Sequence, residues 1–260
     1  MSYLRYVAIG DSQSEGLKDG DETTGYRGWA DRLAELIAAT EPAVTYANLA
    51  VRGKLAAQVR AEQLAPALAL KPDLASVMAG MNDLVRPGFD AAAVAGELEA
   101  MYAALTGQGA RVVTFTFPDI AKIAPITARL RPRVLDLNAR IRTAAERHGV
   151  AVVDTFPHAV TCDARLWSPD RIHAAPLGHA LMAAAAAHAL GLPGSDDTWT
   201  RPLPPRAPIG TLRRAGTEAI WVGSFFGPWV VRRLRGRSSA DGRVAKRPEL
   251  LPVRGPQPTP

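Results

Sequence analysis

The sequence contains very little cysteine and no long apolar run. Cys162 is its single cysteine, which excludes an internal disulfide and any site built from several cysteine ligands. We interpret it as a small buried apolar residue rather than a reactive thiol. The longest apolar stretch, residues 180–192, is too short to cross a membrane, and the first residues lack the basic and apolar segments of a signal peptide. Together these absences predict a cytoplasmic protein.

Motifs for metal ions and nucleotide cofactors are missing as well. No His-Glu-x-x-His pattern occurs in the chain. Four histidines have no carboxylate at a useful spacing, so we interpret them as helix or loop residues: His148, His158, His179 and His188. Gly107-Gln108-Gly109 is too short for a dinucleotide-binding fingerprint and is typical of a helix end. We therefore expect no metal and no cofactor.

The net charge of +6 is unevenly distributed along the chain. Residues 200–260 contain 12 of the 31 basic and 3 of the 25 acidic residues, a net charge of +9, which leaves −3 on residues 1–199. Prolines and arginines become frequent after Leu192. We therefore expect a domain over residues 1–192 and a basic C-terminal extension over residues 193–260, partly amphipathic, whose proline-rich end is disordered.

Strand-like and helix-like segments alternate through the first 190 residues. The predicted strands are residues 6–9, 44–49, 74–78, 111–117 and 150–154. The predicted helices are residues 29–39, 54–68, 91–105, 134–148 and 177–190. This alternation predicts an α/β fold, a three-layer α/β/α sandwich around a five-stranded parallel, doubly wound sheet. In such sheets, binding sites form at the carboxyl ends of the strands.

Three short blocks lie at the ends of the first three predicted strands. Gly10-Asp11-Ser12 places Ser12 at a strand-to-helix turn, where its N–H can face an anion. Gly53 follows the second strand, and a glycine lets a backbone N–H approach a ligand closely. Asn82 follows the third, and a side-chain amide there can donate to a developing oxyanion. Each block alone also fits an ordinary turn, a loop glycine or a helix cap.

A fourth block, Asp170-Arg171-Ile172-His173, precedes an alanine-rich helix. A carboxylate three residues before a histidine can accept its Nδ1–H, which leaves Nε2 free to accept a proton from a serine. Serine is a weak nucleophile until a positioned base takes that proton. Ser12 and His173 are thus two halves of one catalytic device, separated by 161 positions. The alternative is a pair of helix-capping residues.

The ordered set of four blocks resembles the SGNH (GDSL) hydrolase superfamily, and in particular its bacterial GDSL-type lipases and esterases, over about residues 3–192. The resemblance implies a flavodoxin-like sandwich with Ser12 as nucleophile, His173 as general base and then acid, and Asp170 as its orienter. It also implies an oxyanion hole formed by the N–H groups of Ser12 and Gly53 and the side-chain amide of Asn82.

Other residues of these blocks receive structural interpretations. Asp11 and Asp83 belong to the motifs, and we interpret them as residues that hold turns. Glu15 fits a helix start better than a catalytic base. Family members often have threonine at the position of Ser14, and both residues supply a hydroxyl.

The resemblance implies a serine acylhydrolase that cleaves a small-molecule carboxylic ester through an acyl-enzyme. Acyl transfer, thioester cleavage and carbohydrate-ester deacetylation with the same triad remain open. So does a binding function carried by the extension, where Trp221, Phe225, Phe226 and Trp229 precede Arg232, Arg233, Arg235 and Arg237.

Three interpretations of that aromatic and basic segment remain open. In the first, its aromatic side chains dock on the domain. In the second, the segment contacts an anionic lipid surface, and in the third it binds another anionic partner. We expect no nucleic-acid partner, because no nucleic-acid-binding module is recognisable. The sequence leaves the oligomeric state open.

Overall fold

The computed structural model describes residues 3–205, 221, 223–224, 227 and 242–253. At its centre lies a six-stranded sheet with the strand order β7-β6-β5-β1-β4-β8. These strands are β1 Arg5–Gly10, β4 Thr45–Asn48, β5 Leu74–Met78, β6 Arg111–Phe115, β7 Ala151–Val153 and β8 Arg247–Pro252. The five predicted strands are all present and pair in parallel, which confirms the predicted α/β class.

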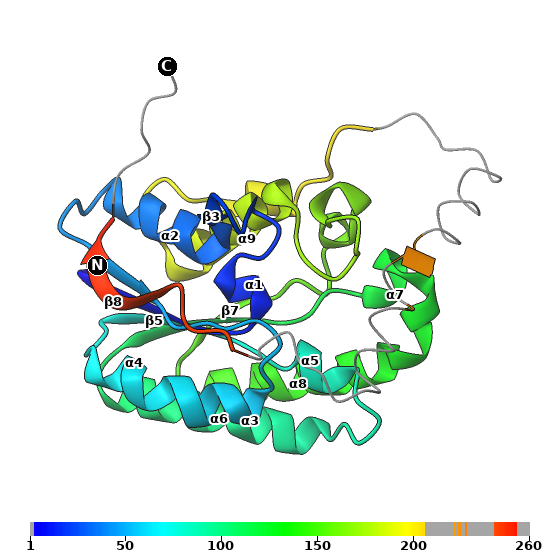
Figure 1. Cartoon of the computed structure of the whole chain (residues 1–260), viewed down its shortest axis with the longest axis horizontal. Helices are drawn as coiled ribbons and strands as arrows, with labels where there is room; N and C mark the ends of the chain where they lie inside the picture. The colour runs from blue at the N-terminus through cyan, green and yellow to red at the C-terminus, as the bar shows by residue number, and fades with distance from the viewer. Residues whose placement is uncertain (1–2, 206–220, 222, 225–226, 228–241, 254–260) are drawn as a thin grey trace.

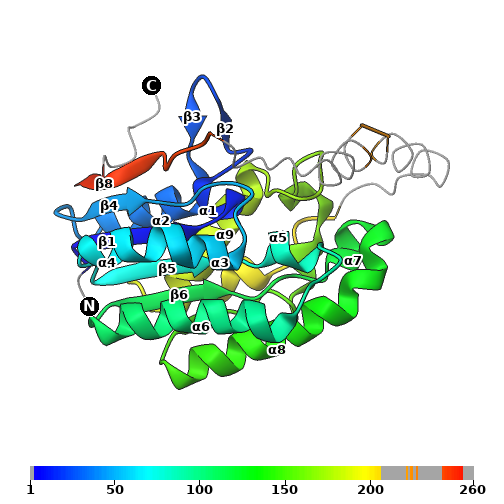
Figure 2. The same ribbon diagram turned by 60° about the horizontal axis from the view of Figure 1, so that its bottom comes forward.

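Helices cover both faces of the sheet (Figure 1). One layer holds α1 Ser12–Glu15, α2 Gly28–Ala38 and α9 Pro176–Leu190. The other layer, in front in Figure 2, holds α3 Ala56–Val59, α4 Ala65–Ala69, α6 Ala91–Gly107 and α8 Arg131–Arg147. Shorter elements include α5 Met81–Leu84, α7 Ile120–Ile123 and the hairpin of β2 Gly20–Asp21 and β3 Gly25–Tyr26. The described residues also include the short 3₁₀ helices Pro125–Leu130, Ala159–Cys162, Ala164–Leu166 and Asp197–Thr200.

The central strands are buried along almost their whole length. β5 is buried throughout, and β1 is buried from Tyr6 to Gly10. Because helices cover both faces, these strands read as continuous apolar runs rather than as alternating patterns. The order β5-β1-β4 makes the carboxyl ends of the first three predicted strands neighbours, so Ser12, Gly53 and Asn82 follow adjacent strands.

The predicted helix over residues 54–68 is divided into three parts. A π-helical turn, Arg60–Leu64, separates α3 from α4. Gln63 in this turn is buried, and its side-chain amide pairs with both backbone groups of Gly10, accepting from N–H at 2.8 Å and donating to the carbonyl at 2.9 Å. Such turns often occur at functional sites, and this one fixes the peptide that leads into Asp11 and Ser12.

The sixth strand, β8, was not predicted. It lies within residues 193–260, which the sequence predicts to be a C-terminal extension, and pairs antiparallel with β4 at the edge of the sheet. Its sequence contains Pro248 and Pro252, which argue against a central strand but are tolerated at an edge. Lys246, just before β8, donates to the carbonyls of Tyr26 and Arg27 at 2.7 and 2.9 Å and to Asp31 at 2.6 Å. Residues 246–252 therefore contact β4 and the segment that leads into α2.

The structure also bears on membrane-spanning helices, metal-ligating clusters and the single cysteine. Within the described ranges, no helix is both long and apolar enough to cross a membrane. In the same ranges, no group of three or more His, Cys, Asp or Glu side chains could hold a metal ion. Cys162 is partly rather than fully buried, and burial raises the pKa of its thiol, which makes it a poor nucleophile.

Candidate active site

Ser12 lies at the tight turn between β1 and α1. Gly10 has a φ of 152°, and in this conformation a Cβ would stand 2.3 Å from the carbonyl oxygen of Met78 on β5, so the turn requires glycine. Asp11 caps α1 by accepting the N–H of Gln13 at 3.2 Å. The hydroxyl of Ser12 follows on this rigid turn, and the residue is 8% exposed.

The loop Ser168–His173 holds a buried carboxylate against an imidazole. Asp170 Oδ1 accepts hydrogen bonds from Ser168 Oγ at 2.6 Å and from the N–H groups of Ile172 and His173 at 2.9 and 3.0 Å. Its Oδ2 lies 2.9 Å from Nδ1 of His173. Burial alone would raise the pKa of Asp170, but the hydrogen bond and charge of His173 hold it well below its usual range.

The imidazole of His173 joins the two distant blocks. Its Nε2 lies 3.1 Å from Oγ of Ser12, while Nδ1 faces Asp170. When Nδ1 donates its hydrogen to the carboxylate, Nε2 is the acceptor of the ring. The 3.1 Å separation lies within the range in which a general base takes a proton from a hydroxyl.

Asn82 lies in the short helix α5 that follows β5, and Gly53 lies on the loop that follows β4. The amide nitrogen of Asn82 donates to Asp11 Oδ2 and to the carbonyl of Lys54, both at 3.1 Å. Gly53 adopts a φ of 79°, which favours glycine. Burial raises the pKa of Asp11 to about 7, and the hydrogen bonds from Gln13 and Asn82 oppose this rise. Asn82 therefore ties the serine turn to the loop that carries Gly53.

A model of the GDSL-like lipase/acylhydrolase family matches residues 8–181. The chain belongs to this family. Membership makes it a hydrolase that acts on ester bonds, and it confirms the resemblance seen in the sequence. None of the curated proteins matches the chain by sequence.

Solved structures share the fold. An α/β hydrolase from the metagenome of Lake Arreo, Spain, has a TM-score of 0.61 at 22% identity over 73% of this chain and 96% of its own. An acetylxylan esterase from Geobacillus stearothermophilus, solved as a catalytic mutant, has a TM-score of 0.61 at 19% identity over 78% and 98%. TesA has a TM-score of 0.59 at 24% identity over 72% and 98%.

Two acidic residues of the family motifs have structural contacts. Asp83 accepts the N–H of Ala56 at 3.0 Å and so begins α3. Glu15 is buried and forms an ion pair with Arg52, whose N–H it also accepts at 2.7 Å. Because Arg52 precedes Gly53, this ion pair holds the glycine loop against α1.

Gln13 was not singled out by the sequence analysis, yet it links the two halves of the site. Its amide nitrogen donates to the carbonyl of Ile172 at 2.9 Å, and its amide oxygen accepts the N–H of Ala174 at 3.2 Å. These residues flank His173 on both sides. Neither partner could be found from the sequence, because they lie 159 and 161 positions away.

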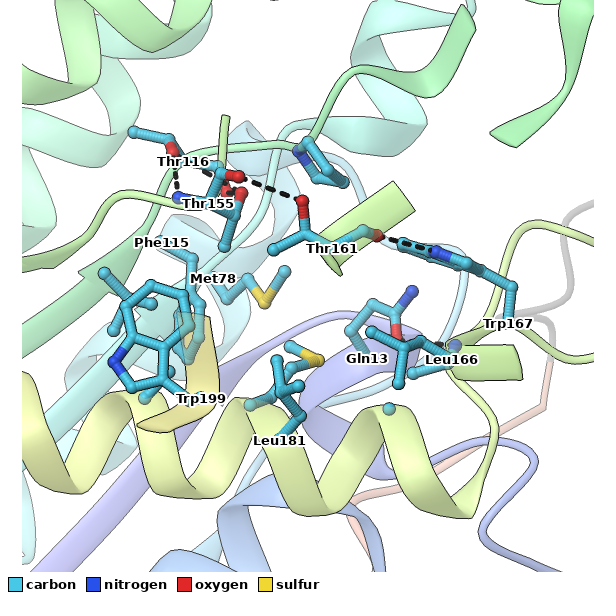
Figure 3. A pocket seen from close by; sticks show the side chains of 16 residues that line it. Gln13, Met78, Phe115, Thr116, Thr155, Thr161, Leu166, Trp167, Leu181 and Trp199 are labelled. Carbon is cyan, nitrogen blue, oxygen red and sulfur yellow. Dashed lines mark hydrogen bonds between the residues drawn. The ribbon is translucent and has the colours of Figure 1, made fainter. Parts of the chain in front are cut away.

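Gln13 also borders an apolar pocket between α9 and the carboxyl ends of β5, β6 and β7 (Figure 3). Met78, Phe115, Leu181 and Trp199 contribute to its wall. Ala174, which follows His173, lines the same pocket, so Gln13 contacts both the pocket and the histidine loop.

The predicted aromatic and basic segment of the extension falls mostly outside the described residues. Phe225, Phe226, Trp229 and the arginines from Arg232 to Arg237 belong to that part. Trp221 is described and is 4% exposed.

Proposed function

We propose that the protein is a serine esterase that cleaves carboxylic esters through Ser12, His173 and Asp170. One observation carries this proposal. It is the continuous chain of contacts from the Asp170 carboxylate through the imidazole to Oγ of Ser12, at 2.9 and 3.1 Å.

In the proposed mechanism, Ser12 Oγ attacks the acyl carbonyl while Nε2 of His173 takes its proton. Asp170 stabilises the imidazolium that forms, because its carboxylate stays ionised. The imidazolium then protonates the leaving alcohol and an acyl-enzyme remains on Ser12. Water, deprotonated by the same imidazole, releases the acid and restores the free serine.

The oxyanion of the tetrahedral intermediate is bound by the N–H groups of Ser12 and Gly53 and by the amide of Asn82. Asn82 donates to Asp11 and Lys54 in the free protein, so one amide hydrogen turns from one of these acceptors to the oxyanion. A donor of this kind contributes about 3 kcal/mol to the stability of such a transition state.

The substrate is a small-molecule ester, and the fold neighbours favour one second candidate. The acetylxylan esterase that shares the fold suggests an acetylated carbohydrate as the ester. Thioester cleavage and acyl transfer use the same three residues. A cytoplasmic location, and contact of the extension with anionic lipid, stay predictions.

Replacement of the nucleophile tests the proposal. Ser12→Ala should abolish hydrolysis of p-nitrophenyl acetate and butyrate and labelling by a fluorophosphonate probe, while the thermal midpoint stays unchanged. Ser14→Ala, two residues away on the same turn, is the matched control and should keep the label. Turnover by a folded Ser12→Ala variant would refute the assignment. Release of acetate from acetylated xylooligosaccharide then tests the carbohydrate candidate.

A further inference from the structure

Trp221 of the C-terminal extension packs against the loop that carries Asp170 and His173. Its indole Nε1–H donates to the carbonyl oxygen of Asp170 at 2.9 Å. The guanidinium of Arg171 lies 4.9 Å from the centroid of its ring. With 4% of its surface exposed, the indole is a buried part of this loop's surroundings.

Arg171 stands between the acid and the base in an unfavourable conformation. Its φ of 57° lies in the left-handed region, which residues with a Cβ rarely adopt. This conformation lets the chain turn back, so that Asp170 Oδ1 accepts the N–H groups of both Ile172 and His173. Stacking of its guanidinium on Trp221 stabilises the side chain of the strained residue.

The loop is therefore held from two sides. On one side Gln13 binds the backbone on either side of His173. On the other side Trp221 binds the backbone of Asp170 and the side chain of Arg171. Gln13 fixes the base relative to the nucleophile, whereas Trp221 is placed to fix the acid.

We infer that Trp221 is a positioning residue for the Asp170–His173 pair, so that the extension completes the catalytic site. The inference rests on the proposed function of these two residues. Without the indole N–H, the Asp170 carbonyl loses a buried donor and the peptide before Arg171 can rotate. Rotation moves the carboxylate away from Nδ1, and the imidazole loses its orientation toward Ser12.

Two substitutions separate the contacts of Trp221, and a third provides a matched control. Trp221→Phe keeps an aromatic ring for Arg171 but removes the N–H, and Trp221→Leu removes both contacts. Tyr102→Phe likewise keeps a buried aromatic ring and removes one side-chain hydrogen bond, the one between α6 and Thr114 of β6 at 2.8 Å. All variants are made in the full chain.

We expect Trp221→Phe to lower kcat about 10-fold, and Trp221→Leu about 100-fold, with KM changed less than about twofold, because misplacement of reacting groups acts on the chemical step. Tyr102→Phe should leave both constants unchanged. The downfield proton resonance of His173 Nδ1–H should broaden in the Trp221 variants and remain sharp in Tyr102→Phe.

Arg171→Gly provides a second test, because glycine adopts the left-handed conformation without strain. In this background the further loss caused by Trp221→Leu should shrink several-fold. Unchanged kcat and an unchanged resonance in Trp221→Phe would overturn the inference while leaving the esterase intact. An active Ser12→Ala variant would instead overturn the proposed function itself. If Trp221→Leu fails to fold, the kcat and the His173 resonance of Trp221→Phe still test the inference.

Discussion

The buried His179 on α9 predicts a specific dependence of stability on pH. Its Nδ1 accepts the N–H of Trp29 at 3.2 Å, and its Nε2 lies 3.1 Å from the carbonyl of Leu17, to which it donates. The lone pair of Nδ1 is thus already used by the Trp29 N–H, so a second proton on the ring would break that hydrogen bond. Burial lowers the pKa of His179 from 6.5 to about 4, although the Leu17 carbonyl and Asp19 oppose this shift.

The sign of the effect follows from proton linkage. Between pH 6.5 and 4 the unfolded chain binds a proton at this histidine and the folded chain does not, so stability falls as the pH falls. A shift from 6.5 to about 4 corresponds to a loss of about 3 kcal/mol across this window. Asp11 acts in the opposite direction, because burial raises its pKa from 3.8 to about 7 and protonation then favours the folded state.

Because these two groups oppose each other, the comparison must be between variants rather than between pH values alone. We expect His179→Gln, a neutral side chain that can still accept and donate one hydrogen bond, to be less stable than the wild type at pH 7.5 by about 1–2 kcal/mol. The difference should vanish or reverse by pH 4.5. Urea unfolding curves at half-unit pH intervals measure it.

If the unfolding free energy of His179→Gln runs parallel to that of the wild type between pH 4.5 and 7, then His179 does not resist protonation and the reasoning is wrong.

Two further substitutions test how the site is held. A Cβ on Gly178 would lie 2.1 Å from the carbonyl oxygen of Leu166, so Gly178→Ala should lower the free energy of unfolding by about 1–3 kcal/mol, measured by urea titration. Gly96→Ala on α6 is the control: its new Cβ meets no atom within 4 Å, so this variant should be as stable as the wild type or more stable. Gln13→Leu keeps the apolar wall but removes both bonds to the histidine loop, so kcat should fall about 10- to 100-fold. Gln58→Leu, at an exposed glutamine, should leave kcat unchanged, and an equal loss there would contradict the interpretation of Gln13.

The sequence predicted those strands and site residues that can be recognised from a short stretch of neighbouring residues. Buried strands such as β5 are apolar apart from a single polar residue, Ser76, and the blocks that carry Ser12, Gly53 and Asn82 follow strands of this kind. The rule that sites form at the carboxyl ends of parallel strands then brings these blocks together without knowledge of side-chain contacts.

What the sequence could not predict depends on contacts between distant residues. β8 carries prolines that hide its strand character, and its pairing becomes evident only beside the open edge of β4. Trp221 reads as one of several aromatic residues in a basic segment. Only the folded chain places its N–H on the carbonyl of Asp170, 51 positions earlier in the sequence.

Uncharged amides hold the serine turn and the histidine loop, whereas the Glu15–Arg52 ion pair holds the glycine loop. Gln63 binds Gly10 and Asn82 binds Asp11, the two residues just before Ser12, and Gln13 binds both residues that flank His173. In the proposed mechanism the imidazole gains and loses a proton in every half-reaction. A charged partner beside it would change its interaction energy with each transfer, whereas an amide carries no net charge and holds the same geometry in both protonation states. Asp170 does carry a charge, but its carboxylate contacts the imidazole at Nδ1, where stabilisation of the imidazolium assists the reaction.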